Sequence, residues 1–322
     1  MKGLGLFFVL SLFAVATTNS QTPADTAKLN TPVDTSWKHA GFTSLSFTQV
    51  SLSNWAAGGE DAYSAVIMFS IFENYAKDKT AWDNSLDLAY GLIKSGDADV
   101  RKNEDKIDLN TKYGYKAFGK FFYSALANFK SQFTAGYNYP DDSTVISQFA
   151  APAYIIIALG LDYKPSNYFS AFISPATGKY TLVMDRQLAD AGAYGVDAAE
   201  YDISGHRTKE GKNIRPEFGA YFRAKFQKDL ATNFNLSSTL NLFDNYTDRD
   251  KNNQANIDVN WETMLALKAG KWITATLFTN LIYDDNIDLP TYETINGVKT
   301  ITGSGPKTQF KEVFGIGVSF KF

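Results

Sequence analysis

The last ten residues, VFGIGVSFKF (Val313–Phe322), alternate between two kinds of side chain. One face of this segment is apolar and consists of Phe314, Ile316, Val318, Phe320 and Phe322. The other face is mostly small or polar and consists of Val313, Gly315, Gly317, Ser319 and Lys321. A period of two predicts a β-strand with one apolar face. An edge strand of a soluble domain also alternates in this way, so the rest of the chain must decide between the two.

The same period recurs through most of the chain, and no helical period persists long enough to compete with it. It is clearest in residues 82–92, 107–115, 218–226 and 257–267. We expect an all-β fold with about twelve strands, near residues 41–52, 63–76, 81–93, 106–117, 121–139, 145–163, 167–183, 216–228, 233–246, 256–268, 272–284 and 309–322.

The linkers between these strands alternate in length. Short ones lie at 77–80, 118–120, 164–166, 229–232 and 269–271, and longer ones at 53–62, 94–105, 184–215, 247–255 and 285–308. The linker at 140–144 breaks the trend. Short turns at one end and long loops at the other are typical of outer-membrane barrels. The sequence therefore predicts a closed antiparallel transmembrane β-barrel.

Three segments leave the strand count open between ten and fourteen. Residues 62–72 are apolar on both faces, and residues 168–184 show no clean alternation. Pro152 and Pro175 lie within expected strands. Proline has no N–H to donate to a strand ladder, so we expect a β-bulge at each.

The N-terminus has the features of a secretory signal peptide. Lys2 precedes an apolar run, LFFVLSLFAVA at residues 6–16, and small and polar residues follow it. We expect a signal peptide at residues 1–20, cleaved after Ser20, a flexible periplasmic tail at 21–36 and the barrel at 37–322. An N-terminal membrane anchor is the alternative, but the run is shorter than the roughly 20 residues of a spanning helix.

Composition excludes several classes of protein. Aromatic residues make up 15% of the chain, yet mean hydropathy is slightly negative, which is unlike a polytopic helical membrane protein. The chain has no cysteine, so disulfides, thiolate catalysis and cysteine zinc sites are excluded. The net charge is −3, and one unit more negative without Lys2, which argues against a nucleic-acid partner. We expect export to the outer membrane of a Gram-negative bacterium.

Six strings, taken in order, resemble a Bacteroidetes-type outer-membrane barrel family known only as a domain of unknown function (DUF3078-like). They are NWAAGGE (54–60), SPATGKYT (174–181), LADAGAYGVD (188–197), LFDNY (242–246), NWE (260–262) and LIYDDN (281–286). The resemblance covers nearly all of the chain after the signal peptide. It implies an outer-membrane barrel and brings no activity and no site residue.

The C-terminal strand suggests partners. A closed barrel must pair its last strand with its first, because an open edge in lipid leaves backbone groups unsatisfied. An amphipathic last strand with aromatic residues at its end, here Phe320 and Phe322, resembles the signal read by the barrel-assembly machinery. The other expected partners are outer-membrane lipid and lipopolysaccharide. The sequence does not indicate an oligomeric state.

The polar faces of the strands carry charges of both signs. The expected lumen-lining residues are Asp83, Asp87, Asp108, Lys112, Arg223, Lys225, Asp258, Glu262 and Lys268. We expect the first three carboxylates to be countered by Lys112 and Lys116, and Asp258 and Glu262 by the other cations, because unpaired charges in a narrow interior are costly. Two interpretations stay open: a sealed barrel filled by ion pairs, and a narrow polar lumen, which we favour because twelve strands enclose more room than eight.

Candidate chemistry is sparse. The only histidines are His39, expected before the first strand, and His206 in the longest loop, so neither lies beside a strand serine. We expect no enzyme activity, no cofactor and no metal. The acidic segments 245–253 and 283–288 could hold Ca²⁺ or bridge lipopolysaccharide, but solvated loop tips are the simpler interpretation.

Two loops remain to be interpreted. NWAAGGE at 54–60 contains Gly58 and Gly59, which suit a shaped turn, and Trp55, which suits the membrane interface; a ligand contact is the alternative. In the loop at 184–215, LADAGAYGVD is expected to be ordered, with an inward-folding constriction left open, and residues 201–213 to be solvated.

The resulting functional hypothesis is a narrow channel for small polar solutes. The alternative is a non-conducting barrel that docks partners through its loops or its periplasmic tail. A lipid-hydrolysing barrel is a weaker third.

Overall fold

The computed structural model describes residues 36–52, 60–139, 141–248, 251, 253, 256–270, 272–295 and 298–321. The expected signal peptide, residues 21–35 of the expected tail, residues 53–59 with most of the NWAAGGE string, and the terminal Phe322 lie outside this range. Within the described residues, no helix has the length and hydropathy needed to cross a bilayer.

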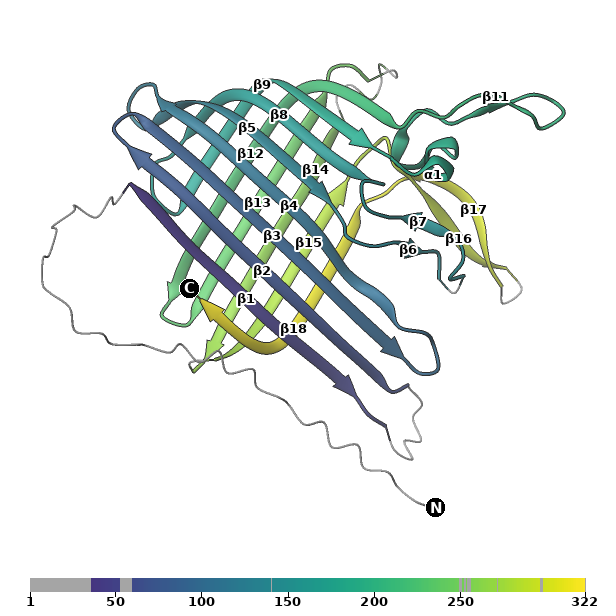
Figure 1. Ribbon diagram of the computed structural model, residues 1–322, viewed down its shortest axis with the longest axis horizontal. Helices are drawn as coiled ribbons and strands as arrows, with labels where there is room; N and C mark the ends of the chain where they lie inside the picture. The colour runs from purple at the N-terminus through teal and green to yellow at the C-terminus, as the bar shows by residue number, and fades with distance from the viewer. Residues whose placement is uncertain are drawn as a thin grey trace, which may run out of the picture. The chain divides into compact units, whose positions relative to one another are not determined.

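Twelve strands form one closed antiparallel barrel (Figure 1). They are β1 (Trp37–Val50), β2 (Ala62–Lys77), β3 (Thr80–Ser95), β4 (Arg101–Lys116), β5 (Phe121–Ser131), β8 (Ala153–Tyr163), β9 (Phe169–Leu182), β12 (Ile214–Ala231), β13 (Phe234–Asn245), β14 (Ile257–Ala269), β15 (Ile273–Tyr283) and β18 (Gln309–Lys321). Each pairs with its neighbours along the chain, and β1 closes the ring against β18 with Phe42 opposite Lys321. The predicted twelve-stranded barrel is confirmed.

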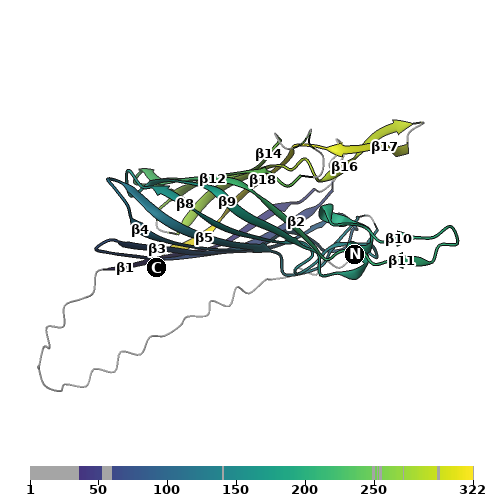
Figure 2. The same ribbon diagram turned by 90° about the horizontal axis from the view of Figure 1, so that it is seen from above.

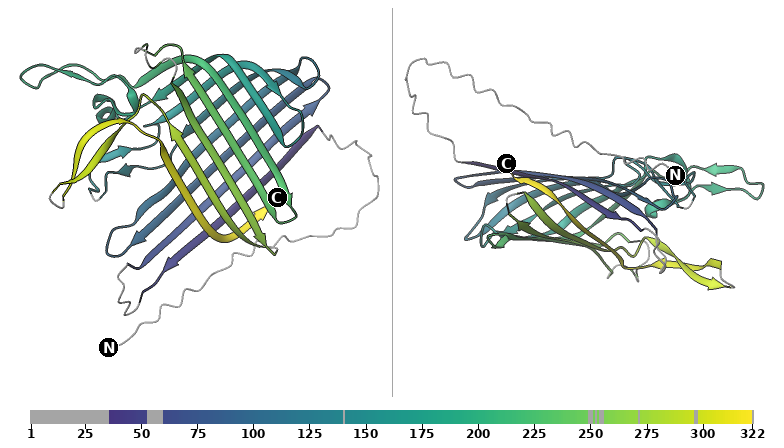
Figure 3. Two further views of the ribbon diagram at one scale, coloured as in Figure 1. Left: turned by 180° about the vertical axis from the view of Figure 1, so that it is seen from behind. Right: turned by 90° about the horizontal axis from the view of Figure 1, so that it is seen from below.

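Figures 1 and 3 show the two walls of the barrel, with β18 beside β15 on one side and beside β1 on the other. The short connections, such as the one between Lys77 and Thr80, lie at the end where β1 starts and β18 finishes. We call this the turn end and the opposite one the loop end.

The loop end carries all of the small elements outside the barrel (Figures 1 and 2). These are the hairpin of β6 (Gly136–Tyr137) and β7 (Val145–Ser147), α1 (Arg186–Asp190), the 3₁₀ turn η1 (Ala193–Gly195), the hairpin of β10 (Glu200–Tyr201) and β11 (Arg207–Lys209), and the hairpin of β16 (Asp288–Ile295) and β17 (Val298–Pro306).

Two expected strands are shorter than the sequence pattern suggested. Barrel pairing stops at Ser131 and resumes at Ala153, and the residues between them form a long loop that includes the β6–β7 hairpin. The expected linker at 140–144 therefore lies within that long loop. The loop-end connections are longer than the turn-end ones except at residues 96–100, whose five residues equal the turn-end connection at 164–168. Pro152 precedes β8 instead of bulging within it, because a residue without an N–H cannot join the ladder.

The predicted bulge at Pro175 is present. Leu159 of β8 opposes Ala176, whereas Leu161 opposes Ile173, so two residues of β9, Ser174 and Pro175, lie opposite the single residue Gly160, and β9 has one extra residue. A Cβ at Gly160 would lie 2.0 Å from the carbonyl oxygen of Ile173. Only glycine lets the bulged strand approach this closely.

The outward face of the barrel is apolar. On β18, Phe314, Ile316 and Phe320 are each roughly half exposed, while the intervening Gly315 and Ser319 are buried towards the interior. Trp272 packs on Phe320 near the turn end, with ring centroids 5.2 Å apart, as in an interfacial aromatic girdle. A continuous apolar outer wall on a closed barrel is what hydrocarbon requires, so the barrel is transmembrane.

Candidate functional site

An ion-pair cluster crosses the middle of the barrel interior. The carboxylate of Glu262 on β14 accepts from the ammonium groups of Lys106 on β4, at 2.5 Å, and Lys130 on β5, at 2.7 Å. Asp108 adds a second carboxylate, 3.4 Å from Lys130. Because β4 and β14 lie six positions apart in the ring of twelve, these contacts bridge opposite walls. We call these four residues the central ion pairs.

A second cluster lies between the central ion pairs and the loop end. Lys179 of β9 contacts Asp258 at 2.5 Å, Asp284 at 3.4 Å and Glu217 at 3.5 Å. Arg215 contacts Glu217 at 3.1 Å. Lys179, Glu217 and Asp284 are buried, so their charges are compensated by one another more than by water.

Apolar side chains fill part of the interior wall at mid-height. They come from five consecutive strands of the ring, β5, β8, β9, β12 and β13, and are Leu126, Ala158, Phe172, Tyr221 and Phe243. Each is less than 5% exposed.

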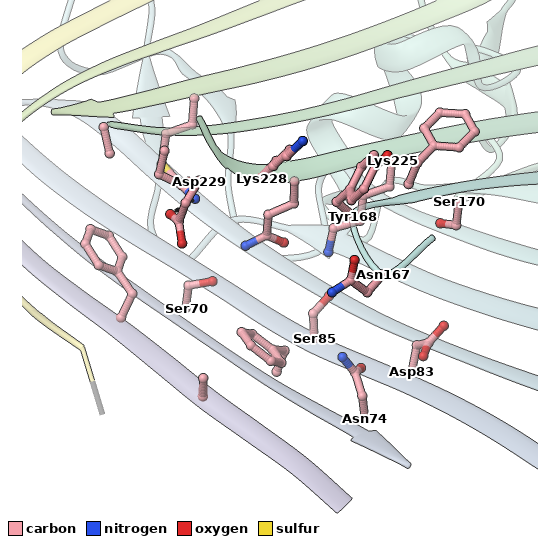
Figure 4. A pocket seen from close by; sticks show the side chains of 18 of the residues that line it. Ser70, Asn74, Asp83, Ser85, Asn167, Tyr168, Ser170, Lys225, Lys228 and Asp229 are labelled. Atoms are coloured by element: carbon pink, nitrogen blue, oxygen red, sulfur yellow. Dashed lines mark hydrogen bonds between the residues drawn. The ribbon is translucent and has the colours of Figure 1, made fainter. Parts of the chain in front are cut away.

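A polar cavity of 760 Å³ lies on the turn-end side of the central ion pairs (Figure 4). Its lining includes Asn167 and Lys228 near the β8–β9 and β12–β13 turns, so it reaches the turn end. We call it the turn-end chamber. Its charged lining residues are Lys112, Lys164, Arg223, Lys225, Lys228, Lys268, Asp83 and Asp229.

Some of these charges are paired. Lys112 contacts Asp162 at 2.7 Å, and Lys164 contacts Asp83 at 2.5 Å. The guanidinium of Arg223, by contrast, donates to the neutral amide oxygen of Asn110. The chamber therefore has both neutralised and uncompensated cations.

The nine charges expected to line the lumen are distributed over the groups described above. Asp83, Lys112, Arg223, Lys225 and Lys268 line the turn-end chamber. Asp87 accepts a hydrogen bond from the hydroxyl of Ser70 on the adjacent strand β2. Asp108 and Glu262 belong to the central ion pairs, and Asp258 to the cluster around Lys179.

One predicted pair is present, since Lys112 lies 3.8 Å from Asp83, but other pairing partners differ from those predicted. Glu262 pairs with Lys106 and Lys130, and Asp258 with Lys179, instead of with Arg223, Lys225 or Lys268. Sequence reasoning paired charges on nearby strands, whereas these contacts join strands far apart in the ring. Lys106 could have been found, since it shares the inward parity of Asp108. Lys179 lies in residues 168–184, which show no clean alternation.

A second, smaller cavity of 310 Å³ lies at the loop end. Its lining includes Gly195, Arg215, Glu217, Asn245 and Asn286, and it shares no lining residue with the turn-end chamber. The interior thus contains separate polar cavities towards its two ends, with charged side chains between them.

Part of the longest loop folds over this loop-end mouth. Asp185 caps α1 by accepting the N–H of Leu188 at 2.9 Å. A Cβ on Gly195, whose φ is +78°, would lie 2.3 Å from the guanidinium of Arg215 on the inner face of β12. Ala189 and Val196 are buried in a small apolar cluster with Val183. Residues 183–196 are therefore packed at the mouth, whereas the β10–β11 hairpin is exposed.

Polar contacts fix this loop. Asp190 accepts the N–H of Gly211 at 2.8 Å and a guanidinium N–H of Arg207 at 2.6 Å, which together hold the pKa of its carboxyl below the usual value. The hydroxyl of Tyr194 donates to the carbonyl of Ile146 at 2.7 Å, and burial raises the pKa of this phenol.

The two histidines and the acidic segment 283–288 were the remaining candidates for a chemical site. His39 lies within β1 instead of before it, near the turn end, whereas His206 lies in the β10–β11 hairpin at the loop end. Across the described residues, no group of three or more His, Cys, Asp or Glu could hold a metal ion. In the acidic segment 283–288, Asp284 is buried against Lys179 and is not a solvated loop tip.

Comparison with solved structures finds other membrane barrels. An outer-membrane channel from Pseudomonas putida F1 is 12% identical with a TM-score of 0.37, covering 88% of this chain and 94% of that one. The NanC porin is 11% identical with a TM-score of 0.35, covering 88% and 100%. The translocator domain of the autotransporter NalP from Neisseria meningitidis is 12% identical with a TM-score of 0.32, covering 88% and 87%. Because these scores are low, the architecture rests on the strand pairing of this chain itself.

No curated protein matches the sequence. One family model does, over residues 47–137, which run from the end of β1 through β6 and include the NWAAGGE string. Its description is "protein of unknown function (DUF3078)". The resemblance drawn from the sequence is confirmed for this region: the first third of the barrel carries the sequence pattern of the DUF3078 family.

Proposed function

We propose that this chain is an outer-membrane barrel of a Gram-negative bacterium, exported by a signal peptide at residues 1–20, and that its lumen is a narrow, normally closed passage for small polar solutes. The single observation that carries the proposal is the pair of polar cavities at the two ends of the interior with the central ion pairs between them.

The chemistry of this barrier favours a passage over a permanent plug. A buried ion pair adds little net stability, because desolvation offsets most of the attraction between the charges. Two lysines share the single carboxylate of Glu262, so a modest rearrangement can exchange partners between Glu262 and Asp108. A barrier of this kind opens at lower cost than a well-packed apolar core.

The test is conductance in planar lipid bilayers, with Glu262→Gln compared with the wild type. Removing the carboxylate leaves Lys106 and Lys130 facing each other, and their repulsion is expected to increase open probability or conductance several-fold. Glu312→Gln, an exposed glutamate on the outward parity of β18, is the matched control and is expected to behave like the wild type. A wild type and a Glu262→Gln variant that both stay silent would refute the passage.

The same observation supports the second candidate, a non-conducting barrel that docks partners through its loops or periplasmic tail. In that case deletion of residues 185–213 changes partner binding and leaves conductance at zero. For a passage, that deletion uncovers the loop-end mouth and raises conductance.

Orientation has its own test. A protease-sensitive tag in residues 199–208 is expected to be cleaved on intact cells, and a tag at 232–233 is not. The reverse result would place the turn end outside the cell.

A further inference from the structure

The turn-end chamber has an excess of positive charge that the proposed passage does not explain. Six lysine or arginine side chains line it, against two carboxylates. Of the six, Lys112 and Lys164 are matched by Asp162 and Asp83. The cations without an ion pair are Arg223, Lys225, Lys228 and Lys268, although Lys225 is attracted at longer range by Asp87, Asp83 and Asp108.

Among the described residues, no ion pair within 4.0 Å involves any of these four cations. Lys228 lies over the ring of Tyr168, 4.6 Å from its centroid, and Arg223 donates to Asn110. The carboxylate of Asp229 at the rim accepts from the amide of Asn235 instead of from a lysine. Unpaired cations inside a membrane barrel are costly, because the surrounding hydrocarbon lowers the local dielectric constant.

The wall opposite these cations offers neutral hydrogen-bonding groups. Lys225 and Lys228 project from β12, and Ser70, Asn74 and Ser85 lie across the chamber on β2 and β3 (Figure 4). Strands β12 and β2 are six positions apart in the ring, so the two sets face each other across its width. A molecule between them would meet ammonium groups on one side and, on the other, amides, hydroxyls and the carboxylate of Asp83, which is paired with Lys164.

We propose that the turn-end chamber binds a small organic anion, one that carries two or more negative charges on carboxylate or phosphate groups together with hydroxyls. A volume of 760 Å³ lies within the usual range of small-molecule pockets. Charge-assisted hydrogen bonds from Lys225, Lys268 and Arg223 would supply affinity, and the serine and asparagine side chains would bind the hydroxyls. The ligand enters from the turn end, and its binding does not require the central ion pairs to open.

Isothermal titration calorimetry on the full barrel folded in detergent tests this directly. The probes are citrate, glucose 6-phosphate and neutral glucose. Both anions are expected to bind and glucose is not, with affinity falling as salt is raised because exposed charges are screened. Binding of only one anion identifies the carboxylate or the phosphate as the recognised group. Failure of both anions to bind at millimolar concentration, or equal binding of glucose, overturns the proposal.

Variants locate the site. Lys225→Met and Lys268→Met are each expected to weaken citrate binding about tenfold, the loss typical of one charge-assisted hydrogen bond. The matched control is Lys209→Met, which removes an exposed lysine from β11 at the loop end and is expected to leave affinity unchanged. Circular dichroism checks that each variant is folded. Equal losses in all three variants would mean non-specific charge attraction and would overturn the assignment to the chamber.

The outcomes separate this inference from the proposed function. If the barrel binds citrate but never conducts, the anion site is supported and the proposed passage is refuted. If Glu262→Gln increases conductance but neither anion binds, the passage is supported and the anion site is refuted.

Discussion

Replacing Glu262 with glutamine measures whether the middle of the barrel is closed. The glutamate side chain is only 16% exposed, and two ammonium groups lie within 2.7 Å of its oxygens. At an effective dielectric constant of about 20, one such pair has roughly 6 kcal/mol of Coulomb attraction, part of which desolvation offsets. Removing one partner of a buried pair costs about 3–5 kcal/mol, because the remaining charge stays buried without compensation. Asp108 still lies 3.4 Å from Lys130 and 3.9 Å from Lys106 and compensates part of their charge, so we expect the lower half of that range.

The assay is urea unfolding of the barrel in phospholipid vesicles, followed by tryptophan fluorescence. Adding Lys130→Met to Glu262→Gln is expected to recover part of the loss, since one of the stranded cations is removed. Glu200→Gln breaks a pair of the same 2.5 Å length in the exposed β10–β11 hairpin and is the control, with an expected cost of about 0–1 kcal/mol.

A Glu262→Gln variant within about 1 kcal/mol of the wild type would refute this reasoning, because only a water-filled lumen would make the central pairs that weak. The interior would then be an open channel, and the separation of the two cavities would have no functional meaning.

Three further predictions concern the wall and the loop end. Ile316→Lys places a charge on the lipid face near the middle of β18 and is expected to destabilise the barrel by about 2–4 kcal/mol, whereas Phe310→Lys near the strand end costs about 0–1 kcal/mol; urea unfolding compares them. Gly160→Ala puts a Cβ 2.0 Å from a carbonyl oxygen of the bulged strand and is expected to lower the yield of folded, heat-modifiable barrel on gels, whereas Gly303→Ala, with nothing within 4 Å, does not. Because the pKa of Asp190 is lowered in the fold, its contribution to loop stability is complete above the unfolded value near 4 and falls as pH drops towards the folded value. In limited pepsin digestion from pH 5 to pH 2, the wild-type loop is expected to be cleaved more slowly than the Asp190→Asn loop at the same pH, and this difference is expected to shrink as pH falls.

These tests can each fail in a recognisable way. Equal losses at both lysine positions on β18 would mean that the outer face is not in hydrocarbon. Normal folding of Gly160→Ala would mean that the bulge relaxes. Equal cleavage of the wild-type and Asp190→Asn loops at every pH would mean that the Asp190 contacts do not hold the loop.

The architecture could be predicted because the signal is local. Alternation along β18 places Phe314 and Ile316 on one face whatever the rest of the chain does, and connection lengths order the strands in space. Strand ends were less certain. The polar and aromatic residues after Ser131 continue to alternate, yet their partners change from the barrel to a hairpin, which no single segment reveals.

The interior charges were predictable as a set but not as pairs. Parity alone directs Asp258 and Glu262 inward. Their partners, Lys179 and Lys106, come from strands on distant parts of the ring, and contact across a lumen depends on the length of each side chain and on the diameter of the barrel. Neither the side-chain reach nor the barrel diameter can be read from the alternation of residues in the sequence.

The most direct test of the account is a nitroxide scan along β18. The chain has no cysteine, so single cysteines at positions 313 to 319 can be spin-labelled without removing any native thiol. In vesicles, the account predicts high oxygen accessibility at 314, 316 and 318 and low accessibility at the odd positions between them, because the even side chains face lipid. Accessibility to a water-soluble nickel chelate at 314, 316 and 318, or the absence of any period of two, would contradict a transmembrane barrel.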